Sequence, residues 1–436
     1  MKRETSIALH ESKELREKYY CIHHKSGLDI YFIPKDLSVT YALFATRYGS
    51  IDNVFRLAGE ESFARVPEGI AHFLEHKMFE AEDGTDTFER FAKIGASANA
   101  FTSNDMTAYE FSCTDHVYEA LEILLDYVTH PYFTKENVEK EQGIIGQEIQ
   151  MCDDNPMRRL YQELLGCLYS KDGVRINICG TKNTIAQITP ELLYRCYNTF
   201  YQLSNMTLVI CGKADCESII SVADKVLKEQ TEEKIERYFE AEPKEVARKR
   251  SAVPMSVGRP LFAIGIKDDR KPSLSGEDAK HAATLQIAGD LLFGVSSDFY
   301  NKMYDEGLLN ATFSCGYEMT RTCGFFMLWG ETDDPEVVYD RVVSWIAEKQ
   351  KNPPSAEDFL RLKRMAYGAH MRIYDSSSEI AYAFLSDLFA GVDLFENADI
   401  IASITYEDVL GKIATFFKAD RFSMSVITPM EDAKNA

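Results

Sequence analysis

Short apolar runs open each half of the chain, and longer stretches with helical periodicity follow them. In the first half these runs predict strands, with one hairpin around the residues KSG and a second pair of strands around NDM. The predicted strands are 19–24, 28–34, 41–48, 97–103 and 107–113, with a closing strand at 206–212. A helix is predicted at 69–80, and helical patterns fill most of roughly a hundred residues after Val117.

The second half repeats this order, with strands first and helices afterwards. Its strands are predicted at 261–267, 312–319 and 324–331, and its helical patterns run from Val337 to Phe417. Strands that are grouped apart from helices are typical of the α+β class, in which helices pack on an antiparallel sheet. The alternation of strand and helix that builds a parallel sheet is not seen, so an α+β fold is predicted.

Two segments far apart in the chain align without a gap, which indicates an internal duplication. ITPELLYRCYNTFYQLSNMTLVI begins at Ile188, and ITYEDVLGKIATFFKADRFSMSV begins at Ile404. Each reads as a threonine cap, a helix, a polar turn and a short apolar strand. We therefore predict two homologous domains, 1–230 and 255–436, joined at 231–254 by a charge-rich linker without apolar periodicity.

The composition and the net charge of the 436 residues indicate a globular protein and argue against some classes of binding partner. Apolar residues make up 45% and charged residues 27%, as in ordinary globular proteins. The net charge of −21 argues against nucleic acid and against an anionic membrane surface, because both require clustered Lys and Arg. The sequence predicts neither a secretory signal nor a membrane span, and its ten cysteines, without a CxxC pair, are expected to be reduced core residues. A cytoplasmic location is therefore expected.

The candidate chemistry lies in the helix predicted at 69–80, GIAHFLEHKMFE. His72, Glu75 and His76 stand at i, i+3 and i+4, so all three project from one face of that helix. Two imidazoles one turn apart can bind one zinc ion, and the carboxylate beside them can take a proton from water that the ion polarises. The alternative is an exposed helix with three polar side chains. The apolar residues around the motif favour burial, where unpaired ionised groups are costly, and so favour a metal site.

A catalytic zinc site needs a third protein ligand, because it keeps three ligands and one open position. Glu141 and Glu148 lie two helical turns apart in NVEKEQGIIGQEIQMCDDNP, on the same side as apolar residues. One carboxylate as a ligand and the other as its support would explain both. A helix with a charged flank explains the spacing equally well, and the pattern alone does not decide between the two.

Several motifs together resemble the pitrilysin/insulinase family of zinc metallopeptidases. HFLEH matches the inverted zinc motif of the inverzincins. GASANAFTSNDMTAYEF, EKEQGIIGQEI and SSDFYNKMYDEGLLN resemble further segments of the family in the same order. The resemblance covers essentially the whole chain and is to the short bacterial branch that is similar to mitochondrial processing peptidase. Within it, HKMFE resembles the YmfH-like proteins of Gram-positive bacteria.

The resemblance implies a role for each of these residues. His72, His76 and Glu148 would bind one zinc ion per chain. Glu75 would be the general base, and Glu141 would support the ligands. The edge strand that binds an extended peptide by β-addition would comprise Asn99, Ala100, Phe101 and Thr102.

The chain departs from the family at two positions of its second domain. Relatives that work as symmetric dimers carry an Arg and a Tyr that hold the substrate in the partner's active site, where this chain has Asp298 and Asn310. The resemblance therefore implies a homologous partner subunit that supplies the Arg/Tyr pair. We expect a zinc metalloendopeptidase subunit that cleaves extended peptides. The alternative is a non-catalytic structural or peptide-binding subunit related to processing-peptidase core proteins.

Overall fold

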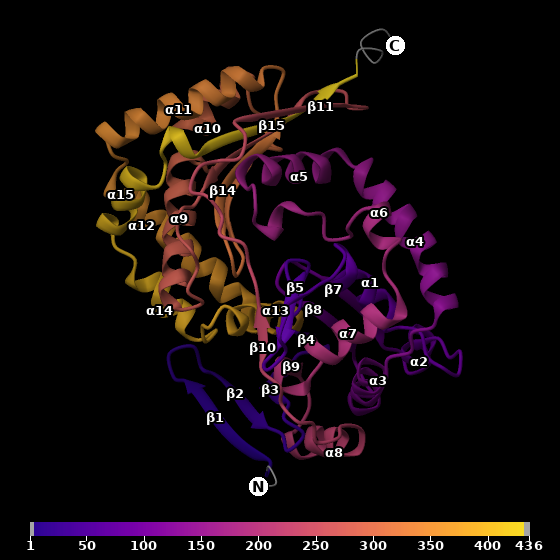
Figure 1. Ribbon diagram of the computed structural model, residues 1–436. Coiled ribbons are helices and arrows are strands. Elements are labelled where there is room, and N and C mark those ends of the chain that lie inside the picture. The colour runs from indigo at the N-terminus through magenta and orange to yellow at the C-terminus, as the bar shows by residue number, and fades with distance from the viewer. Residues whose placement is uncertain (1–3, 431–436) are drawn as a thin grey trace.

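Each half of the chain folds into one large sheet covered by helices (Figure 1). The computed structural model describes residues 4–430. The large sheet of the N-terminal half contains β1 (Ser6–Ser12), β2 (Glu17–His23), β3 (Asp29–Pro34), β4 (Thr40–Thr46), β7 (Ser97–Thr102), β8 (Thr107–Cys113) and β9 (Met206–Gly212). A small sheet contains β5 (Val54–Leu57), β6 (Ala64–Arg65) and β10 (Ile235–Arg237). The sheet of the C-terminal half contains β11 (Arg250–Met255), β12 (Leu261–Lys267), β13 (Ser314–Met319), β14 (Gly324–Glu331) and β15 (Phe422–Pro429).

The helices fall between and around these strands in both halves. Those of the N-terminal half are α1 (Ile70–Lys77), α2 (Thr87–Lys93), α3 (Val117–Thr129), α4 (Lys135–Asp153), α5 (Pro156–Leu168), α6 (Lys182–Ile185), α7 (Pro190–Phe200) and α8 (Cys216–Val226). Those of the C-terminal half are α9 (Gly276–Phe293), α10 (Asp298–Asp305), α11 (Pro335–Lys351), α12 (Ala356–Arg372), α13 (Ser377–Phe389), α14 (Glu396–Ser403) and α15 (Tyr406–Thr415).

The two large sheets have corresponding strand orders. The first is β1-β2-β3-β9-β4-β8-β7 and the second is β11-β15-β12-β14-β13. Neighbouring strands are antiparallel except for β3–β9 and β11–β15, which are parallel. The α+β class is confirmed, and each sheet contains one parallel pair that the sequence did not predict.

The repeat seen in the sequence is a repeat of structure. Helix α7 follows an N-cap at Thr189, and α15 follows an N-cap at Thr405. Both threonine hydroxyls accept a hydrogen bond from the backbone N–H three residues later, which satisfies one of the free donors at the helix start. The strands β9 and β15 then begin at Met206 and Phe422, the same distance beyond the two caps.

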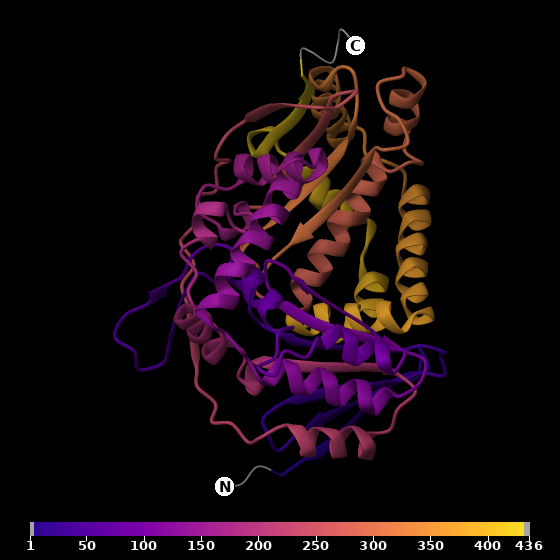
Figure 2. The same cartoon turned by 90° about the vertical axis from the view of Figure 1, so that its right-hand side faces the viewer.

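Each half also covers the second face of the other half's sheet (Figure 2). Phe384 and Leu385 of α13 pack on Leu43 of β4 and Val209 of β9, while the helices of the N-terminal half fill the opposite face of the same sheet. In return, the leucines of α5 pack on β12, β14 and β15. Central strands buried on both faces are continuous apolar runs, as β9 and β12 are. Two hydrophobic clusters therefore contain residues of both halves and pack the halves against each other.

Two predictions about the order of elements are corrected. Helices α9 and α10 lie between β12 and β13, so the expected order of strands first and helices afterwards is wrong for the second half. The segment 231–254 was expected to be a linker, but it contains β10, which pairs with β5, and the start of β11, which pairs with β15. The sequence also missed β1, β5 and β6, because these strands are short or are exposed and polar.

Two expectations from composition can be compared with the structure. Within residues 4–430, no helix combines the length and the apolar character that crossing a membrane requires. All ten cysteines lie in this part of the chain as free thiols, and eight of them are buried.

Candidate metal centre

Helix α1 carries the two histidines and the glutamate of the predicted metal site, and it is buried in the N-terminal half. His72 is 8% exposed and Glu75 is 7% exposed, whereas His76 is partly exposed. Phe73 and Leu74 lie in the hydrophobic core and anchor the helix. The ring centroids of His72 and His76 are 4.6 Å apart, so both imidazoles lie on the same side of α1.

A close contact between two turns fixes the start of α1. Gly69 caps the helix with a φ of 88°, and a Cβ there would lie 2.5 Å from the carbonyl oxygen of Cys179. A Cβ on Gly180, where φ is +72°, would lie 2.4 Å from the carbonyl oxygen of Glu68. Glycine alone accepts both the positive φ and the close approach without strain. The backbone around Cys179 is therefore held directly against the N-terminus of α1.

Helix α4 brings the third predicted ligand to the two histidines. Glu148 Oε1 lies 3.5 Å from His72 Nε2, and Glu148 Oε2 lies 3.5 Å from His76 Nε2. Donor atoms bound to one tetrahedral zinc ion at about 2.0–2.1 Å are separated by about 3.3 Å. The hydrogen bond with His72 is the main cause that lowers the pKa of Glu148, which keeps this carboxylate in the ionised form that binds cations. Each histidine thus lies near this separation from one oxygen of the same carboxylate, which makes the three side chains a candidate zinc site.

Glu141 contacts the other ring nitrogen of His76. Its Oε1 lies 3.1 Å from His76 Nδ1, and its Oε2 lies 3.7 Å from Nζ of the buried Lys77. Burial acts to raise the pKa of Glu141, but the bond to His76 and the charge of Lys77 outweigh burial and lower it. An ionised carboxylate that accepts the Nδ1 proton leaves Nε2 of His76 free to bind a metal.

Glu75 lies between the histidines and the predicted substrate strand. Its Oε2 accepts a hydrogen bond of 2.6 Å from Thr102 Oγ1, at the end of β7. Burial raises the pKa of Glu75, and the histidines and the Thr102 hydroxyl offset this effect only in part. A carboxyl group with a raised pKa suits proton exchange near neutral pH.

A cavity of about 610 Å³ extends over these residues and along β7. Strand β7 is the last strand of the seven-stranded sheet, so within the described residues only its β8 side is paired in that sheet. An unpaired edge can bind an extended peptide through backbone hydrogen bonds. The predicted residues that line this cavity are His72, Glu75, His76, Asn99, Ala100, Phe101, Thr102 and Glu148.

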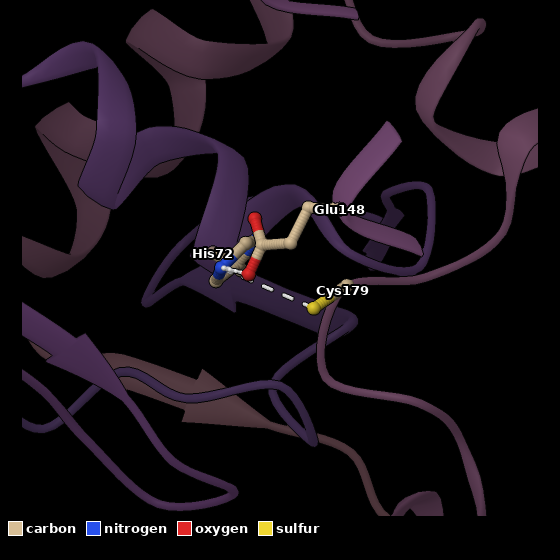
Figure 3. A group of neighbouring side chains, drawn as sticks. All are labelled: His72, Glu148 and Cys179. Atoms are coloured by element: carbon tan, nitrogen blue, oxygen red, sulfur yellow. Dashed lines mark hydrogen bonds and ion pairs between the residues drawn. The ribbon is translucent and has the colours of Figure 1, made fainter. Parts of the chain in front are cut away.

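Cys179 is the residue of this centre that the sequence did not reveal. Its Sγ lies 3.9 Å from His72 Nε2, and the ligand atoms of His72, Glu148 and Cys179 all lie within 4.8 Å of one another. Figure 3 shows the three side chains pointing toward one another from α1, α4 and the loop before α6. Burial is the main cause that raises the pKa of the Cys179 thiol to about 12. The thiol was expected to be an ordinary core residue, and 107 residues separate it from His72.

The two positions expected to lack the substrate-holding pair are placed away from the cavity. Asp298 is the first residue of α10 and is exposed. Asn310 Oδ1 accepts hydrogen bonds from the backbone N–H and the hydroxyl of Thr312. Neither Asp298 nor Asn310 lines the cavity above the metal centre.

Comparison with known proteins identifies the family. The model of Insulinase (Peptidase family M16) matches residues 64–182, and that of the Peptidase M16 inactive domain matches residues 187–366. The uncharacterized zinc protease YmfH of Bacillus subtilis (strain 168) is 40% identical over 425 residues, which cover 96% of this chain and 98% of that protein. The chain belongs to the M16 insulinase family. The resemblance read from the motifs is therefore confirmed, including its YmfH-like branch.

Solved structures show the same M16 fold. The crystal structure of an M16-like peptidase from Alicyclobacillus acidocaldarius matches with a TM-score of 0.90 at 33% identity, covering 99% of this chain and 100% of that chain. A chain of Complex III2 from Candida albicans matches with a TM-score of 0.71 at 12% identity, covering 94% of this chain and 95% of that chain. The fold thus also occurs within a larger assembly.

Proposed function

We propose that this M16 chain is a zinc-dependent endopeptidase in which His72, His76 and Glu148 bind the metal. The observation that carries the proposal is that the two Nε2 atoms approach the two oxygens of one carboxylate, each at 3.5 Å, in the wall of a cavity. Two imidazoles and one carboxylate are a donor set that catalytic zinc sites use. A relative that spans nearly the whole chain is named an uncharacterized zinc protease, which supports zinc as the metal.

Each residue around the metal has a separate role in peptide hydrolysis. Zinc, when bound, acts as a Lewis acid toward the scissile carbonyl and lowers the pKa of a water molecule. Glu75 accepts the proton of the attacking water and returns it to the leaving amine. The Thr102 hydroxyl occupies one oxygen of Glu75, which leaves Oε1 for this proton. Glu141 keeps the ring of His76 in the orientation and tautomer that presents Nε2.

The substrate of this reaction is an extended peptide paired with β7. Asn99, Ala100, Phe101 and Thr102 line the cavity that contains the metal centre, and the edge of β7 offers unpaired backbone groups. Because Thr102 is the last residue of β7 and its hydroxyl donates to Glu75, a peptide along β7 would pass close to the general base. Binding by β-addition depends more on backbone hydrogen bonds than on the side chains of the peptide, so it favours broad sequence specificity.

Substitution of Glu75 by Gln separates metal binding from catalysis. The Glu75→Gln chain should retain zinc but cleave a mixed peptide library about 10²–10⁴-fold more slowly, the range that general acid–base catalysis contributes. Glu148→Gln should instead lose zinc, because it removes one of three protein ligands. The exposed Glu89, which forms an ion pair with Lys93 one turn later on α2, provides the control Glu89→Gln, which should change neither property. Full activity of Glu75→Gln, with contamination excluded, would refute the proposed base.

We further propose that a homologous partner subunit completes the site for substrate. Asp298 and Asn310 replace the cation and the phenol that hold the substrate in the partner's site of symmetric relatives. The chain alone should then cleave peptides about 30- to 1,000-fold more slowly than with a partner that carries the Arg/Tyr pair, which corresponds to roughly 2–4 kcal/mol for two oriented hydrogen bonds. Titrating the partner into the chain tests this. Equal rates with and without the partner would contradict it.

A further inference from the structure

The sulphur of Cys179 lies beside the proposed zinc ligands. Its Sγ is 3.9 Å from His72 Nε2, and it lies within 4.8 Å of a carboxylate oxygen of Glu148. Figure 3 shows the Cys179 side chain directed at the two ligands from the opposite side of the group. Nitrogen and sulphur donors of one tetrahedral zinc ion, at about 2.1 and 2.3 Å, are separated by about 3.6 Å. The observed separation is thus close to that of two atoms that share one metal ion.

The backbone that carries this thiol is held in place. The Cys179 N–H donates to Asn177 Oδ1 at 3.0 Å, and the Cys179 carbonyl lies against Gly69 at the start of α1. The residue is 6% exposed. His72 and Cys179 are therefore positioned by the same contact between α1 and the loop, so their separation is built into the fold and does not depend on a flexible segment.

We propose that Cys179 is a fourth, displaceable zinc donor, so that the resting metal is held by four protein atoms. This inference rests on the zinc site of the proposed function. The thiolate is the form of cysteine that binds metals, and the thiol proton passes to solvent as the sulphur binds. A zinc site with four protein ligands is closed, whereas catalysis needs an open position. The chain is therefore latent until a peptide carbonyl or water displaces the sulphur.

Cobalt in place of zinc reports directly on a sulphur ligand. A thiolate bound to cobalt absorbs in the near ultraviolet by charge transfer, whereas nitrogen and oxygen ligands do not. The full chain loaded with cobalt should show this band, and Cys179→Ala and Cys179→Ser should bind cobalt without it. Cys113→Ala is the matched control, because Cys113 is a thiol of similar burial, 4% exposed, at the end of β8, and it does not line the cavity of the metal centre. This control should keep the band.

The outcomes of the cobalt experiment distinguish the role of Cys179 as a ligand from the existence of the proposed metal site. Cobalt bound to the wild type without the band, or a band that persists in Cys179→Ala, would overturn the role of Cys179 and leave the other ligands intact. A wild-type chain that binds no cobalt would overturn the proposed metal site itself. In addition, zinc-loaded Cys179→Ala should lose its metal to a chelator at least about 10-fold faster than the wild type, because loss of a ligand should cost no less than the roughly 10–100-fold typical of changes in the groups that support ligands. An unchanged rate would contradict a fourth donor.

Displacement is tested in the Glu75→Gln background, in which peptide cleavage should be about 10²–10⁴-fold slower. A peptide that the wild type cleaves should weaken the charge-transfer band of the cobalt-loaded variant as it binds. Peptide binding is followed independently by fluorescence anisotropy of a labelled peptide. If the band stays constant while anisotropy shows saturation, Cys179 is a permanent ligand and the latent state is refuted.

Discussion

Substitution of Gly69 by Ala tests whether the contact between α1 and the Cys179 loop organises the metal centre. The new Cβ would meet the Cys179 carbonyl oxygen at 2.5 Å, and φ at Gly69 is +88°. The left-handed conformation costs an alanine about 1–2 kcal/mol. Relief of the clash requires the backbone to move, which costs about 1–3 kcal/mol more. The free energy of unfolding should therefore fall by about 2–5 kcal/mol.

Gly59 provides the control for this substitution. Its φ is +99°, but a Cβ there would meet nothing within 4 Å. Gly59→Ala should thus lower the free energy of unfolding by only about 1–2 kcal/mol, and the difference between the two variants isolates the contact with Cys179. Both variants change the entropy of the unfolded chain in the same way, so that contribution cancels.

The assay combines urea unfolding, followed by circular dichroism, with zinc affinity from competition with a chelator. Gly69→Ala should weaken zinc binding because it pushes the loop away from His72, whereas Gly59→Ala should not. Gly180→Ala should behave like Gly69→Ala, since its Cβ would lie 2.4 Å from the Glu68 carbonyl oxygen in the same contact. Equal stability and equal zinc affinity of Gly69→Ala and Gly59→Ala would refute the reasoning.

Three further predictions concern single charged residues. Arg321→Met should lower the free energy of unfolding by about 3–5 kcal/mol, because it removes the guanidinium that pairs with the buried Asp52 and with Asp105 of the other half. In urea unfolding, loss of the surface ion pair between Arg259 and Asp333 should cost no more than about 1 kcal/mol. Burial raises the pKa of Asp387 to about 7, so this group favours the folded state less as pH rises from about 4 to about 7, and Asp387→Asn should flatten that part of the stability profile in thermal melts. Glu141→Gln should weaken zinc binding about 10–100-fold in chelator competition without abolishing it, and an unchanged affinity would rule out its supporting role.

Local sequence determined the parts of this protein that depend on helix and strand periodicity. His72, Glu75 and His76 had to share one face of α1, because residues three and four apart on a helix are neighbours. Glu141 and Glu148 had to lie on one side of α4 for the same reason. The repeat around Thr189 and Thr405 likewise appeared in the sequence, because caps and apolar strands are local signals.

Tertiary structure alone decided how these faces meet. Glu148 reaches both histidines only because α4 packs across α1, and no spacing along one helix encodes that crossing. Cys179 lies in the metal centre for the same reason. The turns that contain Gly69 and Gly180 pack against each other and bring together segments that are over a hundred residues apart in the chain. The sequence also did not predict that α5 packs on the sheet of the C-terminal half and α13 on the sheet of the N-terminal half. An apolar helix face indicates that the helix is buried, but it does not indicate which sheet the helix packs on.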